Sequence, residues 1–424
     1  MTTSPTRTGL LIVGASQAGV QLAISLRALG FDGHITLASD EDHRPYQRPA
    51  LSKEFLQGTY DKERLIFRSN EYWDEHDITL LKGVRIESVD KRADGSGVAT
   101  TADGRTIAFD RLALAVGARA RKMEVPGADL GGVLYLRNAD DALELKASLG
   151  EVREAIVVGG GFIGLEAACS LEALGVKTTV IERGPRLVGR AVGEETADYF
   201  LQAHRASGID IRLDAGVEEF VGENGRVTGA VLDDGTELPA QLVLIGIGVI
   251  PNTELAEQMG LDVDNGIVVD RHALASDGVT VAVGDVAYQP NPIPDSPEDE
   301  YIRLESVNNA IEHAKVAAYS LVGQSEDYAG IPWFWSNQGS LKLQIAGLSH
   351  NHDQTVIRRD EEKGKFSVLY YRDGRIIAAD CINHPLDFMA VRGALGKHQN
   401  IPADLAADST VPLKTLAQDL ENVR

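Results

Sequence analysis

The fold is decided by residues 156–166, which read IVVGGGFIGLE. Three apolar residues predict a short buried strand, and Gly159, Gly161 and Gly164 then complete the pattern G-x-G-x-x-G. Apolar residues at three- and four-residue spacing predict an amphipathic helix after this loop; they are Ile163, Ala167, Leu171 and Leu174. Gly175 ends the helix, and residues 177–181 are typical of the next strand. The stretch therefore predicts a β–α–β unit with a glycine-rich first turn.

The three glycines have distinct roles if this loop binds a dinucleotide. The first permits a tight turn, the second lets the backbone approach a pyrophosphate, and the third lets helix and strand pack closely. The anion would then lie on the N–H groups at the helix N-terminus. Glu182 follows the second strand, about twenty residues on, where a carboxylate can accept hydrogen bonds from a ribose. An ordinary β–α–β turn is the alternative, but the complete order of elements favours a dinucleotide site.

Length and composition limit the class of protein. The 424 residues suffice for two or three domains with substantial cores. With 41 basic and 63 acidic residues the net charge is −22, so we expect neither nucleic acid nor a membrane surface as a partner. The chain starts with a short polar stretch rather than an apolar signal core, and no apolar run is long enough for a bilayer. Two cysteines argue against a disulfide framework and predict a cytoplasmic protein.

A first copy of the same unit opens the chain. Residues 10–13 predict a buried strand, residues 14–19 read GASQAG, and a helix is expected to about Leu29. The second strand starts near Ile35, and Asp40 stands where the ribose-binding acid is expected. Ser16 replaces the middle glycine, which crowds the approach of a pyrophosphate only slightly.

The two units are parts of an internal repeat. Each continues into a meander of short strands, around Asp103-Gly104 and Asp234-Gly235, and closes on an apolar strand that ends in glycine. Gly14 and Gly159 are 145 residues apart, whereas Gly104 and Gly235 are 131 apart. Over this span the first copy is 14 residues longer, which is what an extra loop in it would leave. Residues 41–80 of the first copy have no counterpart in the second. Two dinucleotide folds in tandem predict two bound dinucleotides, with chemistry between them.

The remaining segments complete the predicted fold class. The composition of residues 44–53, RPYQRPALSK, favours a solvated loop. A strand ending in Gly-Asp is expected over residues 275–285, an exposed loop over 290–300 and a helix over 306–321. Antiparallel strands are expected at residues 333–335, 341–348, 365–371 and 375–381, followed by a helix near 386–396. The chain is thus predicted as α/β, with two tandem Rossmann-like domains and a C-terminal α+β domain containing an antiparallel sheet.

These features resemble the FAD-dependent pyridine-nucleotide reductases of the glutathione-reductase type. More narrowly, the chain is similar to the ferredoxin reductases of bacterial cytochrome P450 and dioxygenase systems. The motifs that carry this resemblance are RPALSK at 48–53, VGGGFIGLE at 158–166, GVIPN at 248–252, VGD at 283–285, RLESV at 303–307 and PWFWS at 332–336. It implies a discontinuous FAD-binding domain of residues 1–115 and 247–326, an NAD-binding domain of residues 116–246 and a reductase domain of residues 327–424.

The resemblance also implies an FAD site. The first glycine loop and the acid after it would hold the ADP half, and Ile86 would meet the adenine through its backbone. Asp285 would accept hydrogen bonds from the ribityl or pyrophosphate end. The helix that begins near Val307 would direct its N-terminus at the flavin N1/C2 edge, where it favours negative charge. The full predicted set is Gly14, Ala15, Ser16, Ala18, Gly19, Asp40, Arg48, Lys53, Ile86, Gly117, Arg137, Gly284, Asp285, Ser306, Val307 and Trp335.

An NADH site and three catalytic residues follow from the same resemblance. The NADH site would consist of Gly159, Gly161, Ile163, Gly164, Glu166, Glu182, Arg183 and Gly248. The catalytic residues would be Lys53 and Glu166, which pair and hold the nicotinamide amide, and Trp335, which packs beside the isoalloxazine. Glu182 would repel a 2′-phosphate and so favour NADH over NADPH, although Arg183 beside it can accept that phosphate.

Alternatives to these roles remain open at this point. Glu166 is otherwise a helix-surface acid in a salt bridge. Trp333 and Trp335 alternate on a strand, so we expect one of them in the core. The ten histidines show no metal-ligand spacing, and no metal site is predicted.

The positions of the cysteines discriminate between functions. A disulfide reductase of this fold needs a cysteine pair near the flavin, but the first cysteine is Cys169. Cys169 and Cys381 are expected to be small buried residues. Electrons must therefore leave the flavin to a small oxidant or, as the resemblance implies, singly to an iron–sulfur protein. On that resemblance we predict hydride transfer from NADH to FAD and then single-electron transfer to a [2Fe–2S] ferredoxin that serves a cytochrome P450 or dioxygenase. The alternative is a nucleotide-responsive flavoprotein resembling apoptosis-inducing factor, with slow turnover.

Overall fold

The computed structural model describes residues 9–293, 300–328 and 330–419. The chain forms two compact units, each built from three segments. Unit 1 comprises Met1–Gln47, Lys62–Arg119 and Ile250–Gly330, and unit 2 comprises Arg48–Asp61, Ala120–Val249 and Ile331–Arg424. The chain passes between the units near β8 (Ala118–Ala120) and β17 (Val249–Pro251).

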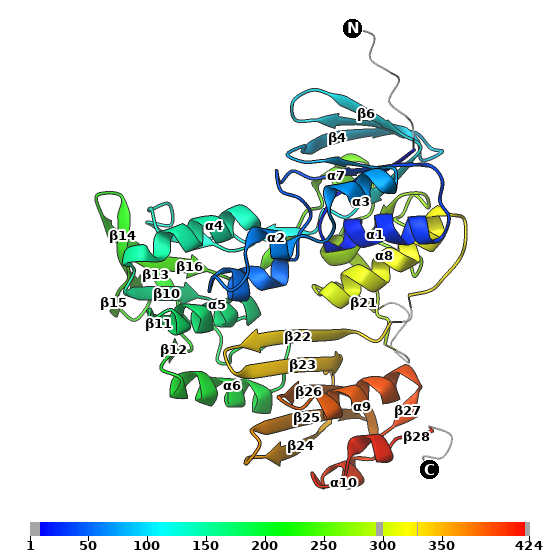
Figure 1. Ribbon diagram of the computed structural model, residues 1–424. Helices are drawn as coiled ribbons and strands as arrows, with labels where there is room; N and C mark the ends of the chain where they lie inside the picture. Colours follow the sequence, from blue (N-terminus) through cyan, green and yellow to red (C-terminus); the bar gives the residue numbers. More distant parts are fainter. Residues whose placement is uncertain (1–8, 294–299, 329, 420–424) are drawn as a thin grey trace. The chain divides into compact units, whose positions relative to one another are not determined.

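Unit 1 is organised around a parallel sheet with the strand order β19-β7-β1-β2-β3. These strands are β1 (Gly9–Val13), β2 (His34–Ala38), β3 (Ile78–Leu81), β7 (Arg111–Leu114) and β19 (Val281–Ala282). Helices α1 (Gln17–Ala28) and α8 (Val307–Leu321) pack against one another and share a buried cluster with Leu10 and Ile12 of the central strand (Figure 1). All residues of β7, β1 and β2 except the first of each strand are buried, so the sheet is covered on both faces.

Smaller elements complete unit 1. The predicted meander is an antiparallel sheet of β4 (Ile86–Lys91), β5 (Gly97–Thr101) and β6 (Thr106–Phe109). The others are α2 (Lys62–Leu65), α3 (Asn70–Glu75), α7 (Glu254–Gln258), β18 (Ile267–Val268), the 3₁₀ turn η4 (Gly284–Val286), β20 (Ala287–Pro290) and β21 (Tyr301–Ile302). Most of the predicted loop at residues 290–300 lies outside the described residues.

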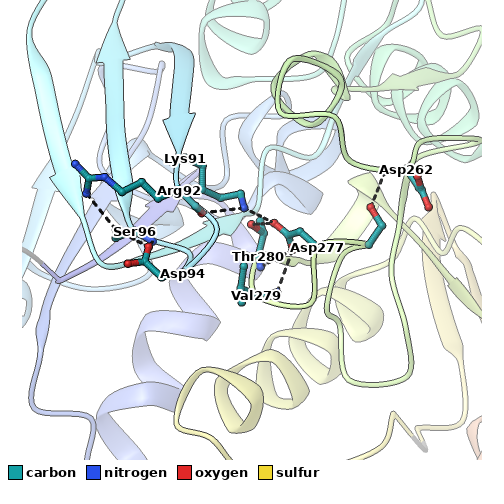
Figure 2. A network of polar contacts seen from close by, with 9 residues as sticks. Lys91, Arg92, Asp94, Ser96, Asp262, Asp277, Val279 and Thr280 are labelled. Atoms are coloured by element: carbon teal, nitrogen blue, oxygen red, sulfur yellow. Dashed lines mark hydrogen bonds and ion pairs between the residues drawn. The ribbon is translucent and has the colours of Figure 1, made fainter.

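The strand predicted over residues 275–285 is confirmed only at residues 281–282. Asp277 folds the first half of that segment into a turn, and Gly284 and Asp285 lie in the 3₁₀ turn η4. Its carboxylate accepts the N–H groups of Val279 and Thr280 at 3.0 and 2.9 Å and the Thr280 hydroxyl at 2.7 Å. It also forms an ion pair with Lys91 of β4 at 3.0 Å (Figure 2). Burial acts to raise the pKa of Asp277, but the bonds from Thr280, Val279 and Lys91 outweigh it and hold that pKa below its usual value. The regular strand therefore shrinks to β19.

Unit 2 contains a second parallel sheet, with the order β12-β11-β10-β16-β9. Its strands are β9 (Val133–Tyr135), β10 (Glu154–Val158), β11 (Lys177–Ile181), β12 (Asp210–Arg212) and β16 (Leu242–Ile245). Its helices are α4 (Ala139–Ser148), followed by the 3₁₀ turn η3 (Leu149–Glu151), α5 (Phe162–Ala173) and α6 (Glu194–Ala206). A meander of β13 (Val217–Glu223), β14 (Arg226–Leu232) and β15 (Glu237–Pro239) precedes β16.

The tandem repeat is confirmed by strand order. In unit 1 the series β7-β1-β2-β3 and in unit 2 the series β16-β10-β11-β12 run in the same spatial sequence. In both, the strand that precedes the glycine loop is central, and the strand after the meander is its neighbour. This arrangement is that of a dinucleotide-binding fold.

The C-terminal part of unit 2 is the predicted antiparallel sheet, in the order β22-β23-β26-β25-β24. Its strands are β22 (Trp333–Gln338), β23 (Leu341–Gly347), β24 (Gln354–Asp360), β25 (Lys365–Arg372) and β26 (Arg375–Ile382). Helix α9 (Pro385–Gly396) packs on this sheet (Figure 1). Short elements follow: β27 (Gln399–Asn400), α10 (Ala403–Ala406), the 3₁₀ turn η5 (Leu413–Thr415) and β28 (Gln418–Asp419). Strand β24 was not predicted, because it is a polar edge strand with few buried positions.

Three local predictions are wrong. The first and last residues of the apolar stripe on α5, Ile163 and Leu174, are exposed, whereas the helix between Gly164 and Leu171 is buried on every side. Residues 48–55 do not form a solvated loop: a 3₁₀ turn, η1 (Arg48–Ala50), leads into a largely buried π-helical turn, η2 (Leu51–Phe55). Trp333 and Trp335 are both half-buried, with ring centroids 5.5 Å apart, since residues two apart on a strand share one face.

Candidate dinucleotide-binding sites

The two glycine loops have the same backbone geometry. Gly14 has φ of +109° and Gly159 has φ of +110°, a region that side chains rarely enter. The last glycine of each loop packs against the first: a Cβ on Gly19 would lie 1.9 Å, and one on Gly164 2.1 Å, from that first glycine's carbonyl oxygen. These four positions therefore require glycine for the fold itself, before any ligand is considered.

The middle position of the loop differs in kind. Gly161 has φ of −81° and Ser16 has φ of −97°, which any residue adopts. A Cβ on Gly161 would meet nothing within 4 Å. The backbone thus tolerates a side chain here, which explains why Ser16 can replace glycine. The open space above Gly161 is what a pyrophosphate approaching the loop would need.

Both helices that follow the loops are suited to an anion. Helices α1 and α5 have no acidic residue in the first turn, and neither N-cap residue, Ser16 or Gly161, makes a side-chain capping bond. The first-turn N–H groups and the positive end of the helix dipole are therefore not countered by the helix's own side chains. These residues fit the pyrophosphate of one dinucleotide in each unit.

The other predicted FAD residues of unit 1 follow the ends of parallel strands. Asp40 comes after β2, Gly117 after β7, and Gly284 and Asp285 after β19, so they share one edge of the sheet with the glycine loop after β1. A Cβ on Gly284 would lie 3.0 Å from that of Ala18, so η4 lies directly against the start of α1.

Two further residues of this set lie at element ends. Ile86 is buried at the start of β4. Helix α8 begins at Val307, as predicted, but the Ser306 hydroxyl already accepts the N–H of Asn309 at 3.0 Å. One donor at this helix end is therefore engaged within the chain.

Glu182 of the predicted NADH site is held beside the glycine loop of unit 2. One carboxylate oxygen accepts the N–H of Gly160 and the other that of Gly184, each at 2.7 Å. Glycine at 160 also avoids contact, since a Cβ there would lie 3.1 Å from that of Glu182. These two amide donors, which the sequence did not predict, fix an acidic group at the carboxyl end of β11. Arg183 next to it is exposed.

Lys53 and Glu166 form a buried ion pair in unit 2. The ammonium on η2 lies 2.6 Å from one carboxylate oxygen of Glu166 on α5, and the two side chains are 11% and 5% exposed. Ser52 donates to the same oxygen at 2.7 Å, and Ser336 of β22 donates to the other at 2.8 Å. Glu166 is therefore not a helix-surface acid, because three donors surround its carboxylate in the interior.

The sequence did not predict these two serine donors. Both stand next to predicted residues in recognised motifs, Ser52 before Lys53 and Ser336 after Trp335. That adjacency was the available signal. A further contact joins two predicted FAD residues of unit 2, since Arg48 donates to the carbonyl oxygen of Arg137 at 2.9 Å.

Trp335 lies in an aromatic cluster on β22. Its ring centroid is 5.5 Å from that of Trp333 and 6.4 Å from that of Phe334, and the Phe334 ring is 4.5 Å from that of Phe162 at the start of α5. Such spacing is typical of packed aromatic side chains. The cluster joins the C-terminal sheet to the second dinucleotide fold within unit 2.

Both thiols are buried and are not thiolates near neutral pH. Burial, together with the charges of Glu172 and Glu166, raises the pKa of Cys169 to about 12. Burial likewise raises the pKa of Cys381 far above its usual range. Since the thiolate is the reactive form, neither residue is suited to redox chemistry. The prediction that both are small buried residues is confirmed.

Neither a metal centre nor a membrane-spanning helix is found in the described residues. Residues 9–293, 300–328 and 330–419 contain no group of three or more His, Cys, Asp or Glu arranged to hold a metal ion. Within the same ranges, no helix has the length and apolarity needed to cross a membrane. A pocket of about 460 Å³ in unit 2 is lined by Arg186 and by residues 189–195 and 349–355, and none of the predicted site residues lines it.

Comparison with known proteins places the chain in a family. Residues 8–318 match the family described as pyridine nucleotide-disulphide oxidoreductase, and residues 333–417 match the reductase C-terminal family. Rhodocoxin reductase from Rhodococcus erythropolis is 40% identical over 405 residues, covering 96% of this chain and 93% of the relative.

Solved structures agree with this result. The ferredoxin reductase for the CYP199A2 system from Rhodopseudomonas palustris has a TM-score of 0.91 at 39% identity, covering 97% of this chain and all of that one. Putidaredoxin reductase, in its covalent complex with putidaredoxin, has a TM-score of 0.90 at 35% identity, covering 97% of this chain and 98% of that one.

Proposed function

Because the chain belongs to the pyridine nucleotide-disulphide oxidoreductase family, we propose that it is an NADH-dependent flavoprotein that reduces a [2Fe–2S] ferredoxin. The observation that carries this proposal is the state of the thiols: Cys169 and Cys381 are both buried, with raised pKa values. In a family named for disulfide chemistry, this chain therefore offers no thiol to take electrons. The relatives named as reductases of ferredoxins support an external one-electron acceptor.

The residues divide into three tasks. In unit 1 the loop from Gly14 to Gly19, with Asp40 and Asp285, would bind FAD, which accepts a hydride and releases electrons singly when bound. In unit 2 the loop from Gly159 to Gly164 would bind the pyrophosphate of NADH. Lys53 and Glu166 would hold the nicotinamide carboxamide, and Trp335 would shield the flavin.

Glu182 would provide the preference for NADH over NADPH. Two backbone amides hold its carboxylate at the end of β11, where the family binds the adenosine ribose. A negative charge fixed at this place repels a 2′-phosphate, while it accepts hydrogen bonds from ribose hydroxyls. Free cysteines agree with a reducing compartment, and we place the protein in the cytoplasm.

The alternative, a binding protein resembling apoptosis-inducing factor, is not favoured. Relatives that cover nearly the whole chain are named as electron-transfer reductases, among them putidaredoxin reductase and the reductase component of a p-cumate dioxygenase system. Together with the ferredoxin reductase for the CYP199A2 system, these relatives support a ferredoxin that serves a cytochrome P450 or a ring-hydroxylating dioxygenase as the partner.

The test is anaerobic mixing of the purified yellow protein with NADH and, separately, with NADPH. We expect rapid bleaching of the flavin by NADH, slow bleaching by NADPH, and reduction of an added [2Fe–2S] ferredoxin followed by its own absorbance. Lys53→Met should slow the bleaching. Lys146→Met is the matched control, since Lys146 also contacts η2, at the carbonyl of Phe55, but does not contact Glu166. Bleaching over minutes, with NADH mainly changing the oligomeric state, would overturn the proposal.

A further inference from the structure

A continuous chain of buried hydrogen bonds runs away from Glu166 through unit 2. Ser336 donates to Oε1 of Glu166 at 2.8 Å, and Gln338 Nε2 donates to the Ser336 hydroxyl at 3.1 Å. Gln338 Oε1 lies 2.7 Å from Nε2 of His204, whose Nδ1 lies 3.6 Å from Sγ of Cys169. The exposed fraction of each of the four residues from Glu166 to His204, backbone included, is 4% or less.

This chain has a single direction. The amide oxygen of Gln338 can only accept, so His204 must carry its proton on Nε2 and leave Nδ1 as an acceptor for the thiol. Burial lowers the pKa of His204, which keeps the ring neutral and agrees with this tautomer. Because Gln338 donates to Ser336, the one hydroxyl proton of Ser336 is directed at Glu166. Every donor from Cys169 onward therefore points toward the carboxylate, and aligned hydrogen bonds of this kind strengthen one another.

The Glu166 carboxylate has more acceptor positions than these donors occupy. An ionised carboxylate has about four lone-pair positions, two on each oxygen. Lys53 and Ser52 occupy both positions on Oε2 of Glu166, whereas Ser336 occupies one on Oε1. With the donors that the described residues provide, one acceptor position therefore remains, and it is on the oxygen that Ser336 holds. An amide N–H is the kind of donor that this position suits.

We propose that Ser336, backed by Gln338 and His204, is a positioning residue for the nicotinamide. It fixes Oε1 of Glu166 so that the remaining acceptor position can receive the carboxamide N–H of the nucleotide. Strand β22 provides this group on the face that carries buried Ser336 and Gln338, whereas half-buried Trp335 and Asn337 lie on the opposite face. The inference rests on the proposed function, because it takes Glu166 as the carboxamide ligand.

Equilibrium binding of NAD⁺ and of ADP-ribose to the FAD-loaded protein tests the proposal without turnover. ADP-ribose has the same pyrophosphate and adenosine but no nicotinamide. We expect Ser336→Ala to weaken NAD⁺ binding about tenfold, because a Glu166 carboxylate no longer held in place would lose its hydrogen bond to the carboxamide. The affinity for ADP-ribose should change by no more than about twofold. Gln338→Leu should give a smaller loss with the same selectivity for NAD⁺.

Ser367→Ala is the matched control, because it also removes a buried serine hydroxyl from the C-terminal sheet. Ser367 is fully buried on β25 and bonds to His384, with no link to Glu166. It should change neither affinity. If Ser336→Ala does not fold, the ratio of the two affinities in Gln338→Leu decides the question.

Three results would overturn the positioning role. Ser336→Ala could weaken NAD⁺ and ADP-ribose equally, which marks a general structural role. Ser336→Ala could leave both affinities unchanged while Glu166→Gln weakens the binding of NAD⁺ alone. In that case Glu166 would contact the carboxamide without any contribution from Ser336. If neither Ser336→Ala nor Glu166→Gln alters the preference for NAD⁺ over ADP-ribose, the carboxamide role of Glu166 fails as well. Failure of the proposed function is a separate observation, namely wild-type flavin that NADH does not bleach.

Discussion

Replacing Lys53 with methionine leaves the carboxylate of Glu166 in the interior with only two hydroxyl donors. The Lys53 ammonium lies 2.6 Å from the carboxylate, a separation worth about 6 kcal/mol of Coulomb attraction at an effective dielectric constant of about 20. Removing both charges from water costs several kcal/mol per ion and offsets most of that gain. Loss of Lys53 removes the Coulomb attraction but leaves the cost of burying the Glu166 carboxylate. Methionine retains the aliphatic stem, so we expect the variant to lose about 3–5 kcal/mol of unfolding free energy.

Urea unfolding of four proteins measures this effect: wild type, Lys53→Met, Glu166→Gln and the double variant. FAD is held at one concentration throughout, because a ligand of the folded state adds stability by mass action. The double variant should lose about 3 kcal/mol less than the sum of the single variants, since two groups in direct contact are strongly coupled. Lys146→Met should lose far less than Lys53→Met. A double variant that equals the sum within about 0.5 kcal/mol would refute the buried pair.

Three further predictions concern other buried groups. Burial raises the pKa of Asp380 to about 6, so the cost of its charge appears as pH rises from about 4 to 6. Asp380→Asn should therefore raise the free energy of unfolding in urea by up to about 3 kcal/mol at pH 8 and leave it unchanged at pH 3. An equal increase at both pH values would contradict this prediction. Cys169 and Cys381 should react with a thiol reagent only after unfolding; labelling of the native protein would contradict their burial. Arg358 is 2% exposed and donates to Asp387 and to three carbonyl oxygens of residues 406–411. Arg358→Leu should lower the free energy of unfolding in urea by about 3–5 kcal/mol, whereas Arg359→Leu at an exposed position should lower it by less than about 1 kcal/mol. Similar losses in the two variants would show that the buried pair of Arg358 and Asp387 contributes nothing.

Local patterns predicted the two dinucleotide folds well. Strand β11 begins and ends at the predicted residues, and helix α8 begins at Val307 as expected. The glycines at positions 14 and 159 were identified because their role is a backbone conformation, which depends on residues close in sequence. Internal repetition then supplied the topology, since the same order of elements occurs twice.

Patterns failed where a distant contact decides the conformation. Residues 51–55 follow a proline-punctuated stretch typical of a loop, yet they form a mostly buried π-helical turn, because Ser52 and Lys53 donate to Glu166, more than a hundred residues away. Strand β24 was missed because only Val356 and Arg358 are buried on it, and Arg358 is a polar residue satisfied by Asp387.

The sequence alone determined which residue types stand at the ends of the parallel strands, and hence the family and the two nucleotide loops. Those features are local, because a glycine turn and an apolar strand are specified within about twenty residues. The pairing of Lys53 with Glu166 was expected from the family resemblance, but only the tertiary structure decided the other groups around Glu166: Ser52 from one segment, Ser336 and then Gln338 from another, and His204 from a third. A buried charge needs hydrogen-bond donors, and the fold can supply them from segments far apart in sequence. No local spacing pattern along the chain therefore predicts which residues they are.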